Sequence, residues 1–266
     1  MEIAVGSRPG IPQQGVDEAY VAEIVAPGIV LLAVAHGFGR IRERSAPAVA
    51  AQAVRDDLRR RVRNERRDPR ASLAAAFAAA NARVYAHSGS NDDHVASGTS
   101  LTAAMIVGDH AFVGHVGATR AYLGRNGVLS TLTTDDALGE GTLRLLTRTL
   151  GTQPTLEPSL AHLRLMDGDA LVLSSGALHE LLDDDEIAEA LRASASSEDV
   201  TARLLAIAGI RGDGAGTVIV GRAFHEAAPD GSRRRPNVRE AGLALVAMLA
   251  ATVVAIVLLH ALFTTA

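Results

Sequence analysis

The segment Leu31–Arg40, LLAVAHGFGR, decides how the rest of the chain is interpreted. It begins with an uninterrupted apolar run, which leads into a turn that contains Gly37 and Gly39. A short apolar run that ends at glycines is typical of a buried strand. The side chain that follows such a strand is held at the edge of the core, where a binding site forms easily. In this chain that side chain is His36.

The composition excludes several classes of function. The 266 residues have 48% hydrophobic content, which is enough for one sizeable core or two small ones. The net charge of −4 and the 3% aromatic content argue against a nucleic-acid partner. The absence of cysteine excludes disulfides, thiolate metal sites and cysteine nucleophiles. No signal peptide is expected from the N-terminal residues, and the alanine-rich, arginine-only usage is typical of a GC-rich bacterial genome.

Hydrophobic periodicity predicts an α+β chain. Runs of strands are interrupted by pairs of helices without strict βαβ alternation, which favours a sandwich of antiparallel sheets. The expected strands are 2–5, 20–25, 29–35, 99–107, 111–116, 121–123, 128–132, 170–174 and 217–221. The expected helices are 45–63, with Ser45 as N-cap, 71–87, 142–150, 183–192 and 198–210.

The composition changes after Arg222. Residues 223–240 are polar and rich in proline and arginine, as in a linker. Residues 241–263 carry no full charge and are long enough, as a helix, to cross a bilayer. Arginines at 233–235 and 239 precede this segment and none follows it, so the positive-inside rule places the large domain in the cytoplasm. The sequence therefore predicts a tail-anchored, single-pass protein of the cell membrane.

Segments from Gly10 to Val220 resemble, in order, the metal-dependent protein phosphatases (PPM, type 2C). The Leu31–Arg40 segment is similar to the family's AVADGMGG, and HVGATRAYL at 115–123 is similar to NVGDSRAYL. GDALVLSSGAL at 168–178 is similar to GDxLLLCSDGL. Further matches lie at 10–17, 98–104, 128–135, 147–154 and 212–220. The resemblance implies a PPM-type α-β-β-α sandwich, two antiparallel sheets flanked by helices, over residues 1–222.

The acidic positions of the family are mostly absent. The resemblance implies two ions, Mn²⁺ or Mg²⁺, held by carboxylates, because these hard ions prefer oxygen ligands. In this chain non-acidic residues stand at the degenerate metal-site positions, which are His36, Gly37, Ala118, Gly176 and Gly214. Asp17 is the only carboxylate retained, and Pro12 stands where the family has a phosphate-binding arginine. A shift of one residue in the alignment makes Asp213 a fallback ligand.

Other motifs do not supply a different chemistry. Ser174 and Ser175 precede a glycine, but the Gly-x-Ser-x-Gly elbow of hydrolases is absent. The glycine-rich run at 212–216 has no following lysine or helix, so we interpret it as a tight turn before a strand. The acidic run at 183–186 is interpreted as the first turn of a helix, where the helix dipole favours negative charge.

These observations lead to two hypotheses. The first is a membrane-tethered pseudophosphatase that lacks the binuclear metal site, needs no cofactor and acts by binding a phosphoprotein, a Ser/Thr kinase or a membrane partner. The second is a weakly active metal-dependent Ser/Thr phosphatase that uses Mn²⁺ or Mg²⁺ at an altered site formed by Asp17, His36 and Asp213. The metal content of the protein distinguishes them.

Overall fold

The computed structural model describes residues 1–8, 17–38, 45–63, 68–89, 98–139, 145–212 and 216–224. The described residues belong to one compact unit, Met1–Phe224. The predicted linker from residue 225 onward and the predicted transmembrane segment 241–263 lie outside the described residues. Among the described helices, none has both the length and the apolar character needed to cross a bilayer.

Two five-stranded sheets form the centre of the unit, and every pair of neighbouring strands in them is antiparallel. The first sheet has the order β10-β5-β4-β3-β2. Its strands are β2 (Asp17–Ala26), β3 (Ile29–Phe38), β4 (Gly98–Val107), β5 (His110–Val116) and β10 (Ser159–Arg164). The second sheet has the order β1-β12-β11-β6-β7. Its strands are β1 (Glu2–Arg8), β6 (Arg120–Arg125), β7 (Val128–Thr131), β11 (Ala170–Ser174) and β12 (Gly216–Arg222).

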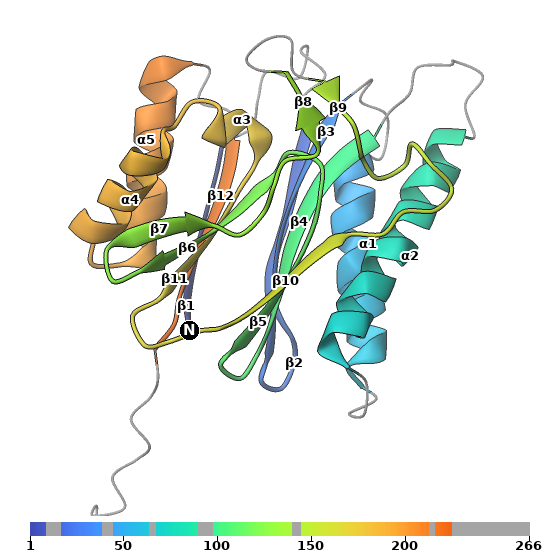
Figure 1. The fold of residues 1–266 in the computed structure, drawn as a ribbon, viewed down its shortest axis with the longest axis horizontal. Coiled ribbons are helices and arrows are strands. Elements are labelled where there is room, and N and C mark those ends of the chain that lie inside the picture. Colours follow the sequence, from blue (N-terminus) through green and yellow to red (C-terminus); the bar gives the residue numbers. More distant parts are fainter. Residues whose placement is uncertain are drawn as a thin grey trace, which may run out of the picture. The chain divides into compact units, whose positions relative to one another are not determined.

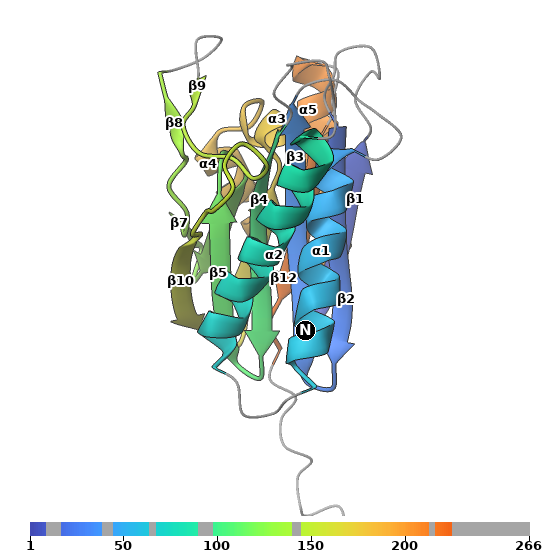
Figure 2. The same ribbon diagram turned by 90° about the vertical axis from the view of Figure 1, so that its right-hand side faces the viewer.

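Helices cover the outer face of each sheet (Figure 1). α1 (Ala46–Arg61) and α2 (Pro69–Gly89) lie side by side on the first sheet, as the turned view in Figure 2 also shows. α4 (Asp184–Ala193) and α5 (Ser197–Arg211) cover the second sheet. The short α3 (Gly176–His179) follows β11, and Ser175, which lies between the two elements, is the N-cap of α3. The predicted α+β sandwich with two antiparallel sheets between helices is confirmed.

Three apolar cores hold these layers together. Leu31, Ala33 and Ala35 alternate toward α1 and α2, where they meet residues such as Phe77. Leu32 and Val34, which have the opposite phase in the same strand, pack between the two sheets. This alternation is the period-two pattern of a strand that is buried on both faces. The prediction that Leu31–Ala35 forms a buried strand is therefore confirmed, since all five residues are fully buried.

Local signals fix several helix ends. Ser45 caps α1, and its hydroxyl accepts a hydrogen bond from the backbone N–H of Ala48 at 3.3 Å. α4 begins with a capping box, in which Asp183 and Glu186 each bond the backbone of the other. The acidic run at 183–186 is thus the first turn of a helix, as predicted.

One predicted element is wrong. Residues 142–150 were expected to be helical, but the described part of that range, from Leu145, forms no helix and begins with a short strand. β9 (Leu145–Leu146) pairs with β8 (Ala137–Leu138), and Leu150 forms a bridge with Thr99. Pairing with residues that are distant in the sequence overrides the local helical propensity here. The sequence also gave no indication of β10 or α3.

Candidate functional site

His36 lies near the end of β3, on the face that looks toward the second sheet. Across the strands it is in register with Glu18 of β2 on one side and with Ser100 of β4 on the other. Residues in register on neighbouring strands lie on the same face of a sheet. Glu18 therefore places a carboxylate on the same face as His36, although the sequence analysis identified Asp17 as the retained carboxylate.

Three of the predicted site positions lie together. A Cβ atom added to Gly176 would lie 2.7 Å from Nδ1 of His36 and 3.7 Å from the carbonyl oxygen of Ala118. The imidazole of His36 therefore occupies the space that any side chain at position 176 would need. We call Glu18, His36, Ala118, Gly176 and His179 the His36 cluster.

Glu18 joins the two sheets at this cluster. Its Oε2 accepts a hydrogen bond from the hydroxyl of Thr217 in β12 at 2.6 Å, and the Thr217 hydroxyl lies 3.0 Å from that of Ser7 in β1. Thr217 is fully buried. A charge-assisted hydrogen bond in a buried setting is stronger than a neutral one. The carboxylate of Glu18 is thus held by a protein hydroxyl.

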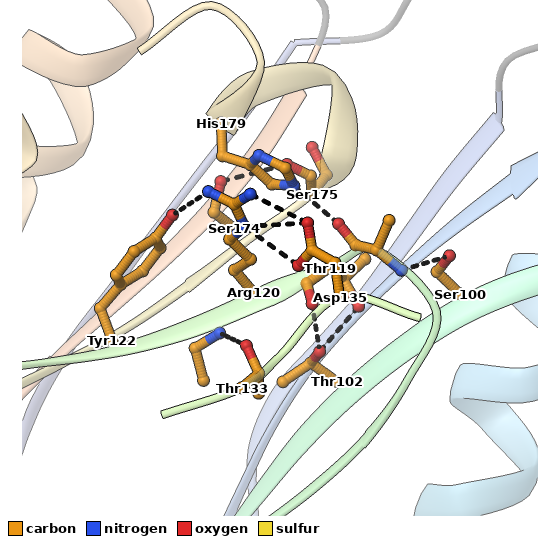
Figure 3. Close-up of polar contacts among 12 residues, drawn as sticks. Ser100, Thr102, Thr119, Arg120, Tyr122, Thr133, Asp135, Ser174, Ser175 and His179 are labelled. Atoms are coloured by element: carbon orange, nitrogen blue, oxygen red, sulfur yellow. Dashed lines mark hydrogen bonds and ion pairs between the residues drawn. The ribbon is translucent and has the colours of Figure 1, made fainter. Parts of the chain in front are cut away.

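The turn at the start of α3 forms the other wall of the cluster. Nε2 of His179, a buried residue, lies 2.6 Å from the carbonyl oxygen of Ala118. The hydroxyl of Ser175 accepts a hydrogen bond from the backbone N–H of Thr217 at 3.0 Å, and the hydroxyl of Ser174 donates to the carbonyl of Ser175. Figure 3 shows His179, Ser174 and Ser175 gathered at this turn. Both serine hydroxyls are buried structural groups and not exposed nucleophiles.

A bidentate ion pair links two of the segments that resemble the phosphatase family. Arg120 donates to Asp135 from Nε at 3.0 Å and from Nη2 at 2.9 Å (Figure 3). Its Nη1 reaches the hydroxyl of Tyr122 at 3.4 Å. Burial raises the pKa of Tyr122, and the nearby Arg120 partly opposes this shift. The guanidinium of Arg120 is therefore committed to side chains of this chain.

A buried polar group lies beside the cluster on β4 and β5. The hydroxyl of Thr102 lies 2.9 Å from Nδ1 of His115 and 2.7 Å from the hydroxyl of Thr119. Burial lowers the pKa of His115, although the nearby carboxylate of Asp136 opposes the shift. His115 also lines a pocket of about 140 Å³ together with Thr133, Thr134 and Ser159. Burial thus favours the neutral form of this imidazole.

Some predicted site residues cannot be placed in the cluster. The backbone of Asp17 is paired with that of Gly37 at the end of β2, but the side chain of Asp17 lies outside the part of the chain that the structure describes. Pro12, Asp213 and Gly214 also lie outside it. Gly37 itself is buried between Asp17 and Thr99 in the sheet.

The described residues do not fit a centre for two hard divalent ions. Gly176 and Ala118 have no side-chain donor, and the carboxylate of Glu18 is bonded to Thr217. Within the described ranges, no three His, Asp or Glu side chains are arranged to hold one ion. Mg²⁺ and Mn²⁺ require several oxygen ligands, and a two-ion centre requires carboxylates that bridge the ions.

Two members of the His36 cluster were missed by the sequence analysis. Glu18 adjoins Asp17, and strand alternation places Glu18 opposite His36 once the pairing of β2 with β3 is known. The signal was therefore present in the pattern but required the register. His179 lies in α3, a helix that the sequence analysis did not predict.

Comparison with known proteins supports the resemblance. The protein phosphatase 2C family model matches residues 29–137. The serine/threonine protein phosphatase PstP of Mycobacterium tuberculosis is 32% identical over 224 residues, which cover 78% of this chain and 42% of PstP. The chain thus spans about two fifths of the length of that relative.

Solved structures agree with this assignment. A crystal structure of M. tuberculosis PstP has a TM-score of 0.71 at 27% identity, over 84% of this chain and 99% of that one. The catalytic domain of PstP in complex with 2 manganese ions has a TM-score of 0.69 at 29% identity, over 84% of this chain and 98% of that one. The register, the layers and the order of the matched segments lead to the same conclusion: the described part of the chain is a PPM-type serine/threonine phosphatase-like domain.

Proposed function

We propose that this chain is a membrane-tethered pseudophosphatase, a PPM-type domain that acts by binding a phosphoprotein or a Ser/Thr kinase. The observation that carries the proposal is the contact between His36 and Gly176. An imidazole fills the space that a carboxylate at position 176 would occupy, and a Cβ there would lie 2.7 Å from its Nδ1. Real Cβ atoms do not approach another atom that closely, so the imidazole at position 36 requires a glycine at position 176.

An exposed apolar pair beside the cluster supports a binding role. Leu138 of β8 and Leu145 of β9 face each other across the two-stranded ribbon and are 66% and 67% exposed. Asp136 anchors this ribbon, because its Oδ2 accepts from the backbone N–H of Gly117 at 2.9 Å and its own N–H donates to the carbonyl of Gly117 at 2.7 Å. Gly117 adjoins Ala118 of the His36 cluster. Two exposed leucines that pair across a ribbon suit a protein partner.

The direction of β12 supports a tether that leaves the cluster free. β12 begins beside α3, where Thr217 bonds Ser175, and it ends at Arg222. At about 3.3 Å per residue, Arg222 lies roughly 17 Å from Thr217 along the strand. In the proposal, residues 241–263 cross the cell membrane, with the domain in the cytoplasm. The cluster then faces cytoplasmic partners.

The competing proposal is a weak metal-dependent phosphatase. It is favoured by one observation, the carboxylate of Glu18 opposite His36. The two proposals differ in the fate of a phosphothreonine peptide incubated with the full-length protein and Mn²⁺ or Mg²⁺. The pseudophosphatase releases no phosphate above the protein-free control. Metal-dependent release that disappears in both Glu18→Gln and His36→Ala contradicts it and establishes the enzyme.

The binding role has its own test. The intact membrane protein is recovered from its host after bound proteins have been cross-linked to it. It is expected to retain a kinase or a phosphoprotein, which is identified by mass spectrometry. Leu138→Ser together with Leu145→Ser is expected to release this partner. Val128→Ser is the matched control, because Val128 is 63% exposed but lies in β7 of the second sheet and not in the ribbon. Equal recovery by all three proteins would contradict a binding role for the β8–β9 ribbon.

A further inference from the structure

Two imidazoles meet on the surface of the first sheet, away from the His36 cluster. His110 is the first residue of β5 and His162 lies in the neighbouring strand β10. Nδ1 of His110 lies 3.0 Å from Nε2 of His162. In the antiparallel register His162 is opposite Phe112, so the two histidines are diagonal neighbours. One of these two nitrogens must carry a lone pair that points at the other ring.

Both rings are held in place by neighbours. His162 stacks on Phe112, with ring centroids 4.4 Å apart and planes 6° from parallel. The second nitrogen of His110, Nε2, lies 3.6 Å from Oδ1 of Asp109. Oδ2 of Asp109 in turn accepts a hydrogen bond from Nε of Arg164 at 2.6 Å. This hydrogen bond orients the carboxylate beside the ring.

This arrangement is similar to the surroundings of a metal-binding histidine, with the carboxylate of Asp109 at ion-pair distance from the ring. A ligating imidazole almost always directs its other ring nitrogen to a carboxylate or a carbonyl, which fixes the tautomer and the ring orientation. At His110 the nitrogen that faces Asp109 is Nε2, and the nitrogen that faces His162 is Nδ1. The carboxylate of Asp109 and the imidazole of His162 therefore lie at the two different nitrogens of the His110 ring.

We propose that Nδ1 of His110 and Nε2 of His162 bind one late transition-metal ion, Zn²⁺, Cu²⁺ or Ni²⁺. Two nitrogens at about 2.0–2.1 Å from a tetrahedral ion lie about 3.3 Å apart, so the rings need to separate by only a few tenths of an ångström and turn toward the ion. Imidazole suits these three ions, whereas Mg²⁺ and Mn²⁺ prefer oxygen ligands.

The site has two protein ligands, and water completes the coordination. The side chain of His110 is 46% exposed, which leaves room for water and for entry of the ion. Asp109 is held by Arg164 and stays a supporting group and not a ligand. The site is separate from the family's ion positions, because His110 follows the β4–β5 turn and no residue of the His36 cluster belongs to it.

The test is a calorimetric titration of the full-length protein with Zn²⁺, repeated with Ni²⁺ and with Mn²⁺. One Zn²⁺ per chain is expected at the histidine pair, with no heat from Mn²⁺ at the same concentrations. His162→Gln is expected to weaken this binding at least 10-fold, and Asp109→Asn is expected to weaken it by about 10-fold. His87→Gln, in α2, is the matched control and is expected to leave it unchanged.

A spectroscopic measurement identifies the ligands directly and does not depend on the measured affinities. With one equivalent of Cu²⁺, the electron paramagnetic resonance spectrum is expected to show coupling to two imidazole nitrogens, one of which is lost in His162→Gln. Circular dichroism checks that each variant is folded. Zn²⁺ affinity that is unchanged in His162→Gln, or binding only at millimolar ion, would overturn the proposal.

Discussion

The contact between His36 and Gly176 makes a quantitative prediction for Gly176→Ala. Gly176 is the first residue of α3 and does not have a positive φ, so alanine suits its backbone. On backbone grounds alone, the substitution would stabilise the protein by about 0.4–1 kcal/mol. The new Cβ, however, would lie 2.7 Å from Nδ1 and 3.2 Å from Cε1 of His36. Overpacking of this kind costs about 1–3 kcal/mol, so we expect a net destabilisation of about 1–2 kcal/mol.

The same substitution is expected to reverse sign when the imidazole is removed. In a His36→Ala background the Cβ at position 176 has no ring to displace, so Gly176→Ala is expected to be neutral or stabilising by about 0.4–1 kcal/mol. The coupling free energy between the two positions is then about 2 kcal/mol, within the range for residues in direct contact. For a domain of this size that corresponds to a difference in Tm of about 4–8 °C.

The assay is urea denaturation of the four proteins of the cycle, made as residues 1–224 because this unit contains all three cores. Gly124→Ala is the matched control. Its Cβ would meet Cδ1 of Leu191 at 2.8 Å, a similar clash at a site that does not involve His36. The effect of Gly124→Ala is expected to be the same with and without His36. If the Gly176 and His36 effects add within about 0.5 kcal/mol, the imidazole does not fill the position, and the reasoning fails.

Three further predictions follow from the cluster, from His115 and from the C-terminal sequence. Restoring carboxylates at all the degenerate positions together is expected to create Mn²⁺ binding, measured by titration. Gly176→Asp alone is expected only to destabilise the folded domain. Mn²⁺ binding after that single change would show that the ligand set is wrong. The combined variant carries His36→Asp, Ala118→Asp, Gly176→Asp and Gly214→Asp. Burial lowers the pKa of His115, so below about pH 6.5 the unfolded chain takes up a proton more readily than the folded one. The free energy of unfolding is therefore expected to fall as the pH drops below about 6.5, and to fall less in His115→Asn. Equal urea midpoints for the two proteins between pH 7.5 and 5 would refute this. A reporter fused after Ala266 is expected to be active outside the cytoplasm, and activity only inside it would refute the proposed membrane crossing.

Much of the fold could be predicted because its signals are local. The strand from Leu31 to Ala35 and the helix that begins after Ser45 are each marked by apolar spacing and by the residues at their ends. The extended segment at Leu145–Leu146 was missed, because it is defined by pairing with Ala137–Leu138. Such pairing leaves no trace in a short window of sequence.

The candidate site shows the same division. The order of the motifs implied that His36, Ala118 and Gly176 belong to one site, and in the structure they do lie together. The choice of Glu18 as the partner of His36 depends on the register of β2 on β3, which one residue of slip would reverse. The pair formed by His110 and His162 is separated by 52 residues and becomes visible only when β10 is seen to lie beside β5.

The central claim, that this domain lacks the two-ion centre of the active phosphatases, is tested most directly by Mn²⁺ titration of the full-length protein followed by electron paramagnetic resonance. Free Mn²⁺ gives a six-line spectrum that is lost when the ion is bound to protein. The histidine pair does not confuse the measurement, because Mn²⁺ prefers oxygen ligands. We predict that the six-line intensity stays equal to that of buffer at micromolar Mn²⁺. Loss of two equivalents of signal per chain, restored by Glu18→Gln, would contradict the account.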